Sequence, residues 1–222
     1  AHNASIEKFI FLWSSCIYPK FAPQPLKEEY LLTDSLEPTN EWYAIAKITG
    51  VKACQAIRNQ YNKEYVSLMP TNLYGSFDNF DLQSSHVLPA MLRKFHEAKL
   101  NKNSDVILWG SGTPMREFLF VDDMAEAVVF ALENNLPEYL YNIGTGKDIS
   151  IKQLAETIQK VIGHQGEIIW DAEKPDGTPR KLMDVSKMKA MGWQYSTELE
   201  DGIKKTYQWY VENIDSIKEI KL

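Results

Sequence analysis

Hydrophobic and polar positions along this chain alternate between short apolar runs and longer segments with helical spacing. Residues 9–15 (FIFLWSS) form a nearly continuous apolar run that ends in small polar residues, which is typical of a buried strand in a parallel sheet. A helical pattern without internal proline follows at about residues 41–59, and a second buried run covers residues 65–69. The order strand, helix, strand is the unit of a doubly wound α/β sheet, so we expect a Rossmann-like parallel sheet.

The remaining chain predicts shorter and more irregular elements. Residues 70–85 are rich in Asn, Asp and Ser and indicate a loop, while residues 121–123 (VDD) and Ser150 are candidate helix caps. Further helices are predicted at about residues 87–98, 121–133, 151–162 and 202–214, and strands at 105–108, 118–121, 140–143 and 167–170. We therefore expect a Rossmann domain over residues 1–80 and a smaller C-terminal α/β lobe over 81–222, with the chain crossing back around 118–146.

A glycine-rich turn for a dinucleotide is absent from the sequence. A nucleotide-binding α/β domain normally opens with a strand, such a turn and a helix N-terminus that receives the pyrophosphate. The glycine-spaced turns at residues 110–112 (GSG) and 144–146 (GTG) do not fit that pattern. We expect that roughly 90 residues at the beginning of the domain are missing, so that the Rossmann sheet is truncated at its N-terminal side.

Composition and charge indicate an ordinary globular protein and exclude several other classes of protein. The 222 residues are 44% hydrophobic and 24% charged, as in ordinary globular proteins. With 24 Lys+Arg against 30 Asp+Glu, the net charge of −6 argues against general attraction to nucleic acid. Two cysteines, Cys16 and Cys54, are too few for a disulfide framework, and no spacing predicts a metal site. No signal or membrane-spanning segment is evident, so we expect a cytoplasmic protein.

Tyr43 and Lys47 are the first candidate catalytic residues. At positions i and i+4 they share one helix face, where a cation lowers the pKa of a phenol and suits it to proton transfer. Such pairs are also common on solvated helices. The pair Ser14-Ser15 favours a functional role for Tyr43 and Lys47, because it ends a predicted strand and the carboxyl ends of parallel strands form ligand crevices.

Five further blocks carry a resemblance to a known family. They are SSCIYP (14–19), EPTNE (37–41), MPTNLYG (69–75), WGSGTPMREF (109–118) and KPDGTPRK (174–181). Together with Tyr43 and Lys47 they look like the GDP-L-fucose synthases, within the extended branch of the short-chain dehydrogenase/reductase superfamily. This family converts GDP-4-keto-6-deoxymannose to GDP-L-fucose by 3,5-epimerisation and then NADPH-dependent reduction of the 4-keto group. The resemblance covers essentially the whole chain.

The resemblance implies roles for individual residues. Cys16 and His86 correspond to the acid/base pair of epimerisation, and Tyr43 corresponds to the proton donor of reduction. Lys47 corresponds to the residue that holds the nicotinamide ribose, and Ser14 to the residue that hydrogen-bonds the carbonyl oxygen. The implied NADP(H) contacts are Leu12, Trp13, Ser14, Ser15, Tyr43, Lys47, Pro70, Thr71, Asn72, Leu73 and His86. The implied GDP-sugar contacts are Lys94, Trp109, Arg116 and Asp176. The family also pairs its helices near residues 41–59 and 87–98 across a two-fold axis, so a homodimer is implied.

Simpler interpretations stay open for several of these residues. Cys16 could be a small buried hydrophobe, His86 a helix cap or a surface residue, Trp109 a core residue and Arg116 half of a surface ion pair. Three positions depart from the family: Trp13 and Phe120 stand where a small residue and a histidine are familiar, and Lys94 stands where an arginine is familiar. We expect less oriented phosphate binding at Lys94, since lysine is a point charge.

Two other functions remain as alternatives. A related nucleotide-sugar epimerase or dehydratase would share Tyr43 and Lys47 without needing Cys16 and His86. An inactive fragment would act only as an interaction module.

Overall fold

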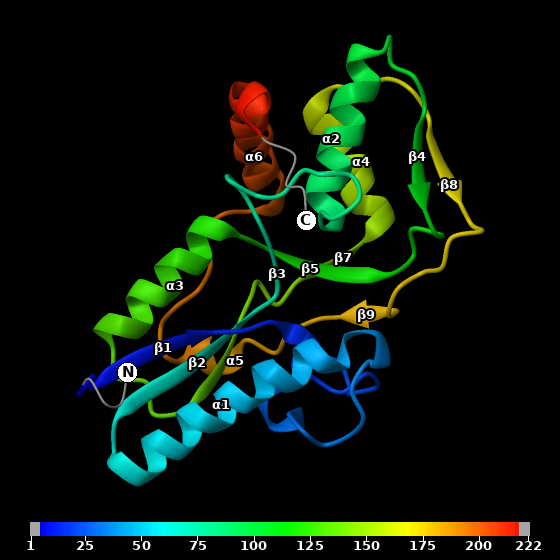
Figure 1. Ribbon diagram of the computed structural model, residues 1–222. Helices are drawn as coiled ribbons and strands as arrows, with labels where there is room; N and C mark the ends of the chain where they lie inside the picture. Colours follow the sequence, from blue (N-terminus) through cyan, green and yellow to red (C-terminus); the bar gives the residue numbers. More distant parts are fainter. Residues whose placement is uncertain (1–4, 218–222) are drawn as a thin grey trace. The chain divides into compact units, whose positions relative to one another are not determined.

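The parallel sheet predicted from the first third of the chain is present in the computed structural model, which describes residues 5–217 (Figure 1). Strands β1 (Lys8–Leu12), β2 (Glu64–Pro70) and β6 (Leu140–Ile143) are parallel and lie in the order β1-β2-β6. Helix α1 (Glu41–Tyr61) runs between β1 and β2 in sequence, as the strand-helix-strand pattern predicted. The chain is therefore of the Rossmann-like α/β class.

The chain folds into two units, which we call unit 1 and unit 2. Unit 1 comprises the chain up to Leu73, then Glu117–Asp148 and Lys181–Ser196. Unit 2 comprises Tyr74–Arg116, Ile149–Arg180 and the chain from Thr197 onward. The chain thus returns to unit 1 twice, and the second return, at 181–196, was not predicted from the sequence. The roles of the two units as cofactor domain and substrate domain stay a prediction.

Each unit has its own helices, and short strands lie where the chain passes from one unit to the other. Unit 1 also contains α3 (Val121–Glu133) and α5 (Ser186–Ala190). Unit 2 contains α2 (Val87–Leu100), α4 (Ile151–Ile162), α6 (Leu199–Asn213) and the parallel pair β4 (Val106–Trp109) and β8 (Ile168–Asp171). The passing strands are β3 (Asn72–Tyr74), β5 (Met115–Phe120), β7 (Asp148–Ser150) and β9 (Arg180–Lys181).

The first strand is shorter than predicted. It ends at Leu12 instead of residue 15, although the amide of Trp13 still donates to the Leu68 carbonyl at 3.1 Å. Beyond that point the carbonyls of Ser14 and Ser15 accept from the amides of Ile17 and Tyr18, so the chain tightens into the 3-10 turn η2 (Ser15–Ile17). The turn satisfies these backbone groups locally and ends the strand.

Three other local predictions can be compared with the structure. Ser150 forms a capping box with Gln153, which confirms the predicted start of α4. The predicted cap at 121–123 is wrong: α3 begins without a side-chain cap, and the Asp123 carboxylate accepts from the amide and hydroxyl of Ser196 instead. The predicted loop 70–85 contains strand β3, whose backbone pairing the local composition did not indicate.

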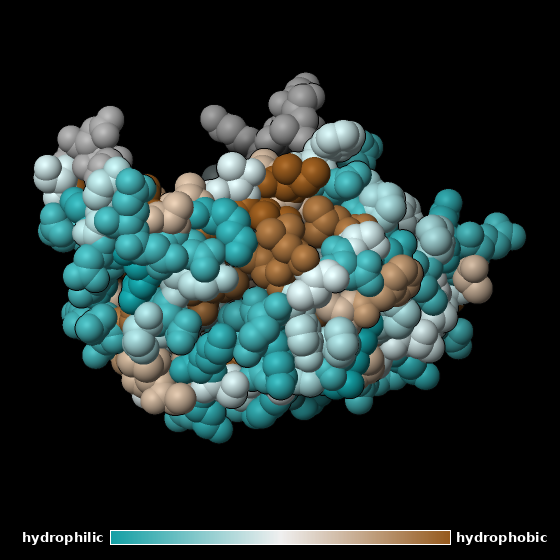
Figure 2. Space-filling view, turned by 90° about the horizontal axis from the view of Figure 1, so that it is seen from below, coloured by the Kyte–Doolittle hydropathy of each residue, from teal (hydrophilic) through white to brown (hydrophobic). Residues whose placement is uncertain are grey.

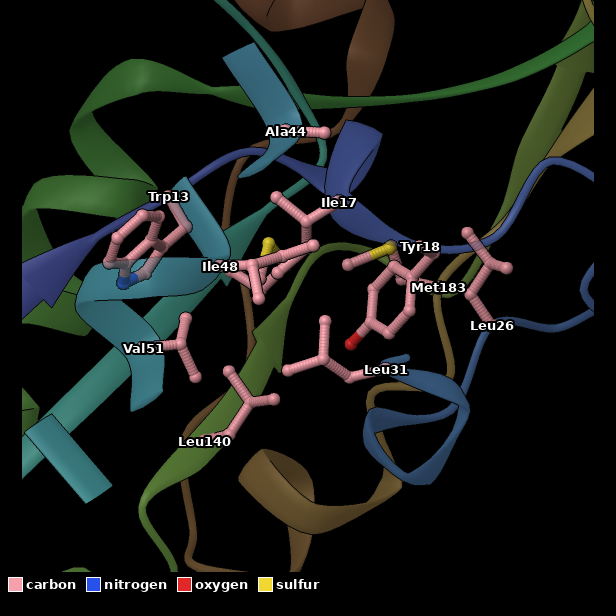
Figure 3. Packing of buried hydrophobic residues seen from close by; sticks show 11 residues of the cluster. Trp13, Ile17, Tyr18, Leu26, Leu31, Ala44, Ile48, Val51, Leu140 and Met183 are labelled. Atoms are coloured by element: carbon pink, nitrogen blue, oxygen red, sulfur yellow. The ribbon is translucent and has the colours of Figure 1, made fainter. Parts of the chain in front are cut away.

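Unit 1 is stabilised by a core in which large side chains of η2, α1 and the following loop meet. This core contains Trp13 and Ile17 near η2, Ile48 and Val51 of α1, and Tyr18, Leu26 and Leu31 of the loop that follows η2 (Figure 3). Trp13 is only 5% exposed, and Ile17 is fully buried. Full burial of side chains of this size contributes about 2 to 3 kcal/mol each, so this core anchors the turn that follows β1.

Hydrophobic residues also remain on the surface. On one face of the molecule they gather in a patch surrounded by hydrophilic residues (Figure 2). Over the described residues, no helix is long and apolar enough to cross a membrane.

Candidate active site

The turn after β1 places three small polar side chains at the carboxyl end of the sheet. Ser15 is buried, while Ser14 and Cys16 are partly exposed. The Cys16 thiol donates to the Ser14 hydroxyl across 2.9 Å. Leu12, the last residue of β1, is 46% exposed beside them. The sequence therefore predicted the position of this cluster correctly, although it predicted a strand where the structure has a turn.

Helix α1 brings Tyr43 and Lys47 to the same place. The Tyr43 hydroxyl lies close enough to Ser14 and Cys16 for both to influence its pKa. The Lys47 ammonium lies 5.4 Å from the centre of the Tyr43 ring and 5.4 Å from that of Trp13. Ser14, Cys16, Tyr43 and Lys47 are thus one cluster, as the family resemblance implied.

One part of the prediction for Tyr43 is wrong. We expected the neighbouring cation to lower the pKa of the phenol, but the pKa of Tyr43 is raised. Desolvation is the main cause, followed by the negative charge that Cys16 carries when ionised; the neighbouring Ser14 hydroxyl opposes both. In this state the phenol keeps its proton, so Tyr43 is suited to donate one.

Trp13 fills space against α1. Its ring packs edge-on against Phe11, with the ring centres 3.8 Å apart. A Cβ at Gly50 would come within 2.7 Å of the indole, so the large residue at 13 is accommodated by the glycine at 50. The indole N–H is buried without a hydrogen-bond partner among the described residues. Trp13 therefore supports Lys47 and the turn by packing.

The predicted cofactor segment 70–73 is fixed by its own side chains. The Thr71 hydroxyl and the Asn72 amide both donate to the Glu117 carbonyl, at 3.2 and 2.8 Å. Pro70 pairs with Ile143 in the sheet, and Leu73 packs on the second core cluster of unit 1. The side chains of residues 70–73 already make hydrogen bonds or packing contacts within unit 1. Any cofactor contact in this segment would therefore be made by its backbone.

Glu117 is a structural residue that the sequence analysis missed. Its side chain is fully buried, and its carboxylate accepts from the amides of Met183 and Gly146 at 2.8 and 2.7 Å. Burial raises the pKa of Glu117, which the backbone hydrogen bonds only partly offset. A glutamate inside the apolar run of residues 115–121 was the available signal. Glu117 joins three separate segments of unit 1.

A second missed network holds the loop that follows η2. The Tyr18 hydroxyl donates to Asn142 Oδ1 at 2.6 Å, and burial raises the pKa of Tyr18. The Asn142 amide N–H donates to Glu28 Oε1 at 2.9 Å, and its side chain donates to the Leu26 carbonyl at 2.8 Å. Tyr18 lies two residues after Cys16, so this network helps to hold the turn.

In unit 2, His86 is exposed at the N-cap position of α2 and makes no side-chain cap hydrogen bond. The simpler interpretation of His86 as a helix-capping side chain is therefore wrong. The half-buried Asp78 carboxylate interacts electrostatically with it. Burial raises the pKa of Asp78, and the charge on His86 opposes that rise. Asp78 is a neighbour of His86 that the sequence analysis did not identify.

The remaining predicted ligands of unit 2 lie on turns and strand ends. Trp109 is 68% exposed at the end of β4, with the Lys174 ammonium 5.5 Å from its ring centre, so it is not a core residue. The Asp176 carboxylate accepts from the amide and hydroxyl of Ser111 at 2.9 and 2.7 Å, and these bonds lower its pKa. Asp176 therefore shapes the turn at residues 110–113.

Arg116 and Lys94 are cations whose charges no carboxylate neutralises within residues 5–217. One Arg116 nitrogen donates to the Met115 carbonyl at 2.7 Å, and burial lowers the pKa of Arg116. Gly177 lies so close that a Cβ there would come within 3.0 Å of the guanidinium. Lys94 donates to the Ile107 carbonyl at 3.0 Å, and burial lowers the pKa of Lys94 too. Half-buried cations of this kind favour an anionic ligand.

Comparisons with known proteins agree with these observations. Residues 1–144 match the model of the NAD dependent epimerase/dehydratase family. GDP-L-fucose synthase of Escherichia coli strain K12 is 53% identical, over 98% of this chain and 71% of the relative. GDP-L-fucose synthase 1 of Arabidopsis thaliana is 55% identical, over 96% of this chain and 66% of the relative. The chain spans about two thirds of the length of these relatives.

A solved structure shows the same similarity in three dimensions. A GDP-L-fucose synthetase from Naegleria fowleri bound to NADP superposes with a TM-score of 0.90 at 29% identity. The match covers 98% of this chain and 70% of that chain.

Proposed function

Because this chain belongs to the NAD dependent epimerase/dehydratase family and, within it, to the GDP-L-fucose synthases, we propose that it carries the active-site residues of such an enzyme. The proposed reaction converts GDP-4-keto-6-deoxy-D-mannose to GDP-L-fucose by epimerisation at C3 and C5 and reduction at C4. The observation that carries this proposal is the cluster at the carboxyl end of β1, in which the Cys16 thiol bonds to Ser14 and both residues lie beside Tyr43. It combines a thiol and a phenol in one place.

Epimerisation needs an acid and a base. The 4-keto group acidifies the protons on C3 and C5, so a base can remove each of them and an acid can return a proton to the opposite face. We assign these roles to Cys16 and His86. The exposed imidazole of His86 is free of cap hydrogen bonds, and the Asp78 carboxylate lies within electrostatic range of it.

Reduction needs a proton at O4. Tyr43 keeps its proton until the alkoxide develops, since its pKa is raised. Ser14 donates to the carbonyl oxygen and orients it. NADPH, when bound, supplies the hydride. Tyr43 is 46% exposed, and no carboxylate engages the Lys47 ammonium among the described residues, so both groups fit the hydroxyls of a nicotinamide ribose.

The GDP part of the substrate is assigned to unit 2. The Arg116 guanidinium donates in a planar fork that matches a phosphate, and Lys94 adds a point charge. The exposed indole of Trp109 offers a flat apolar face. Asp176 acts on this ligand through the turn that it holds with Ser111. A homodimer, which the family resemblance implied, and a cytoplasmic location complete the proposal.

The test follows deuterium into the substrate. The 222-residue chain is incubated with GDP-4-keto-6-deoxy-D-mannose in deuterated water without NADPH, and C3 and C5 are observed by NMR. We expect incorporation that is lost in Cys16→Ser and His86→Asn. Cys54→Ala, which changes the buried thiol of α1, is the matched control and retains incorporation. A folded chain that incorporates no deuterium would contradict the proposal.

An assay with NADPH separates this function from its closest alternative. A GDP-L-fucose synthase consumes one NADPH for each substrate molecule reduced, whereas an epimerase or dehydratase of the same family regenerates its cofactor. Stoichiometric oxidation that depends on Tyr43 is expected. Turnover of substrate without net oxidation of NADPH would favour the alternative.

A further inference from the structure

We propose that Trp13 is a positioning residue, whose indole ring holds the Lys47 ammonium in place for a ligand by a cation–π interaction. This inference rests on the proposed function, in which Lys47 binds the ribose hydroxyls of the nicotinamide cofactor. The family resemblance implied that Trp13 itself contacts the cofactor. Trp13 is only 5% exposed, however, and offers little surface for a direct contact. It acts on the cofactor through Lys47 instead.

The Lys47 ammonium lies over two aromatic rings. Its nitrogen is 5.4 Å from the centre of the Trp13 ring and 5.4 Å from that of the Tyr43 ring. Both distances are within the range of about 6 Å over which the negative face of an aromatic ring attracts a cation. Tryptophan attracts cations more strongly than the other aromatic side chains, and burial of the ring reduces screening by water.

The two rings hold the charge of Lys47 without using its hydrogen-bond donors. An ammonium group has three N–H donors and no acceptor. Within residues 5–217, no hydrogen bond or ion pair engages the ammonium of Lys47. A carboxylate in place of the rings would accept from these donors and neutralise the charge, whereas the face of a ring only orients the ammonium. Lys47 therefore keeps its donors for the hydroxyl groups of a ligand.

The surface of helix α1 has space for the indole beside Lys47. Tyr43, Lys47 and Gly50 are spaced four and three residues apart, so they share one face of the helix. Gly50 has no side chain, and a Cβ there would come within 2.7 Å of the indole. Figure 3 shows the Trp13 side chain lying against α1. The glycine thus lets the ring approach the helix close to Lys47.

The indole is itself fixed by the sheet. It packs edge-on against Phe11, with the ring centres 3.8 Å apart, and the Trp13 amide donates to the Leu68 carbonyl at 3.1 Å. A long lysine side chain loses much rotamer entropy when a ligand fixes it. A rigid ring that already restricts the Lys47 ammonium reduces this loss before the ligand binds. Trp13 therefore orients Lys47 in advance.

The experiment observes Lys47 directly in the chain without ligand. The lysines are labelled with carbon-13 at Cε, and the NMR signal of Lys47 is assigned by its loss in Lys47→Arg. Protons over an aromatic ring experience its ring current, so we expect the Cε protons of Lys47 to resonate upfield of those of exposed lysines. Trp13 is then replaced site-specifically by mono-, di- and trifluorotryptophan, which withdraw electrons from the ring face and nearly keep its size. The Lys47 signal should move stepwise toward the position of exposed lysines.

Side-chain variants separate the ring face from its bulk. Trp13→Leu keeps an apolar side chain without a ring, whereas Trp13→Phe keeps a smaller ring. We expect the upfield shift of Lys47 to be reduced in Trp13→Leu and partly restored in Trp13→Phe. Trp42→Leu, at an 81%-exposed position of the same helix, is the matched control and leaves the signal unchanged. If either Trp13 variant fails to fold, the fluorine series still decides, because it preserves the packing of the core.

Two results for the Lys47 signal would overturn the proposal. In the first, Lys47 of the wild type has the signal of an exposed lysine. In the second, the signal is shifted upfield but stays the same across the fluorine series, so that the electrons of the Trp13 ring do not hold the ammonium.

Binding of NADPH connects this contact with the proposed function. We expect the dissociation constant for NADPH to rise about fivefold from tryptophan to trifluorotryptophan. An affinity that stays constant while the Lys47 signal moves would overturn the positioning role. A signal that follows the ring in a folded chain that binds no NADPH would support the cation–π contact and contradict the proposed function. Turnover with NADPH and a signal that ignores the ring would overturn the role of Trp13 alone.

Discussion

The candidate residues of unit 1 and unit 2 differ in what they bond to. In unit 1, the Cys16 thiol bonds to Ser14, and Tyr43 lies beside them above a packed core. In unit 2, Lys94 and Arg116 donate to nearby backbone carbonyls, and Asp176 holds a turn. Side chains that bond to one another set each other's protonation, whereas side chains bonded to backbone are held in place. Under the proposed function, this difference fits proton transfer by the unit 1 cluster and anchoring of a ligand by Lys94, Arg116 and Asp176, with His86 as the residue of unit 2 that is assigned to proton transfer.

The largest expected effect comes from the core beneath the unit 1 cluster. Trp13→Ala removes a 5%-exposed indole that packs against Phe11 and α1, so we expect a loss of about 3 to 5 kcal/mol in the free energy of unfolding. Urea denaturation measures it. Trp42→Ala, the same change at an 81%-exposed position of α1, is the matched control and changes stability little. Equal losses at the two positions would show that unit 1 lacks this core.

Arg116→Lys tests the anchoring role of unit 2. A lysine keeps the charge but loses the fork, so we expect KM for the GDP-sugar to rise about 10-fold while kcat changes little. Steady-state kinetics measures both constants. Arg93→Lys serves as the control, because Arg93 pairs with Glu97 on the surface of α2. A fall in kcat without a change in KM would place Arg116 with the reacting groups and remove the contrast between the units.

A smaller effect concerns pH and the buried carboxyl of Glu117. Burial raises the folded-state pKa of Glu117 above its unfolded value, so its contribution to stability is fully present below the unfolded pKa and is lost as pH rises through the folded pKa. The stability of the wild type relative to Glu117→Gln should therefore decrease from pH 4 to pH 8. Denaturation of both proteins across this range measures the difference. A difference that stays constant or increases with pH would contradict the raised pKa.

The smallest effect is expected at the exposed turn of unit 2. Asp176→Asn weakens the bonds to Ser111 that keep the pKa of Asp176 low. We expect faster amide hydrogen exchange at Ser111 with little change in global stability, since the carboxylate is exposed. In the wild type the same exchange should accelerate as pH falls and Asp176 is protonated, after correction for intrinsic rates. Unchanged exchange would mean that the backbone alone holds this turn.

Local patterns were sufficient to predict the elements of the Rossmann-like sheet. The apolar runs at 9–15 and 65–69 and the helical spacing at 41–59 correspond to β1, β2 and α1, because a buried parallel strand and an amphipathic helix each need a distinctive order of residues. Strand β3 was not predicted, since its partners are distant in sequence.

The spacing of Tyr43 and Lys47 and the block SSCIYP were likewise sufficient to predict the cluster of unit 1. Motif residues at the end of a strand and in the first turns of the next helix are brought together by the α/β topology itself. The direction of the pKa shift of Tyr43 could not be predicted in the same way. The pKa of Tyr43 is raised by partial desolvation and by Cys16, and spacing along a helix reports neither of them.

The sequence by itself determined which residue types are available and approximately where most of the helices and strands lie. Only the tertiary structure decided that the Cys16 thiol bonds to Ser14 beside Tyr43, that Trp13 occupies the space left by Gly50, and that Glu117 is buried among backbone amides. Periodicity and motifs describe neighbours along the chain. Hydrogen-bond partners and desolvation depend on neighbours in space, which the packing of separate segments creates.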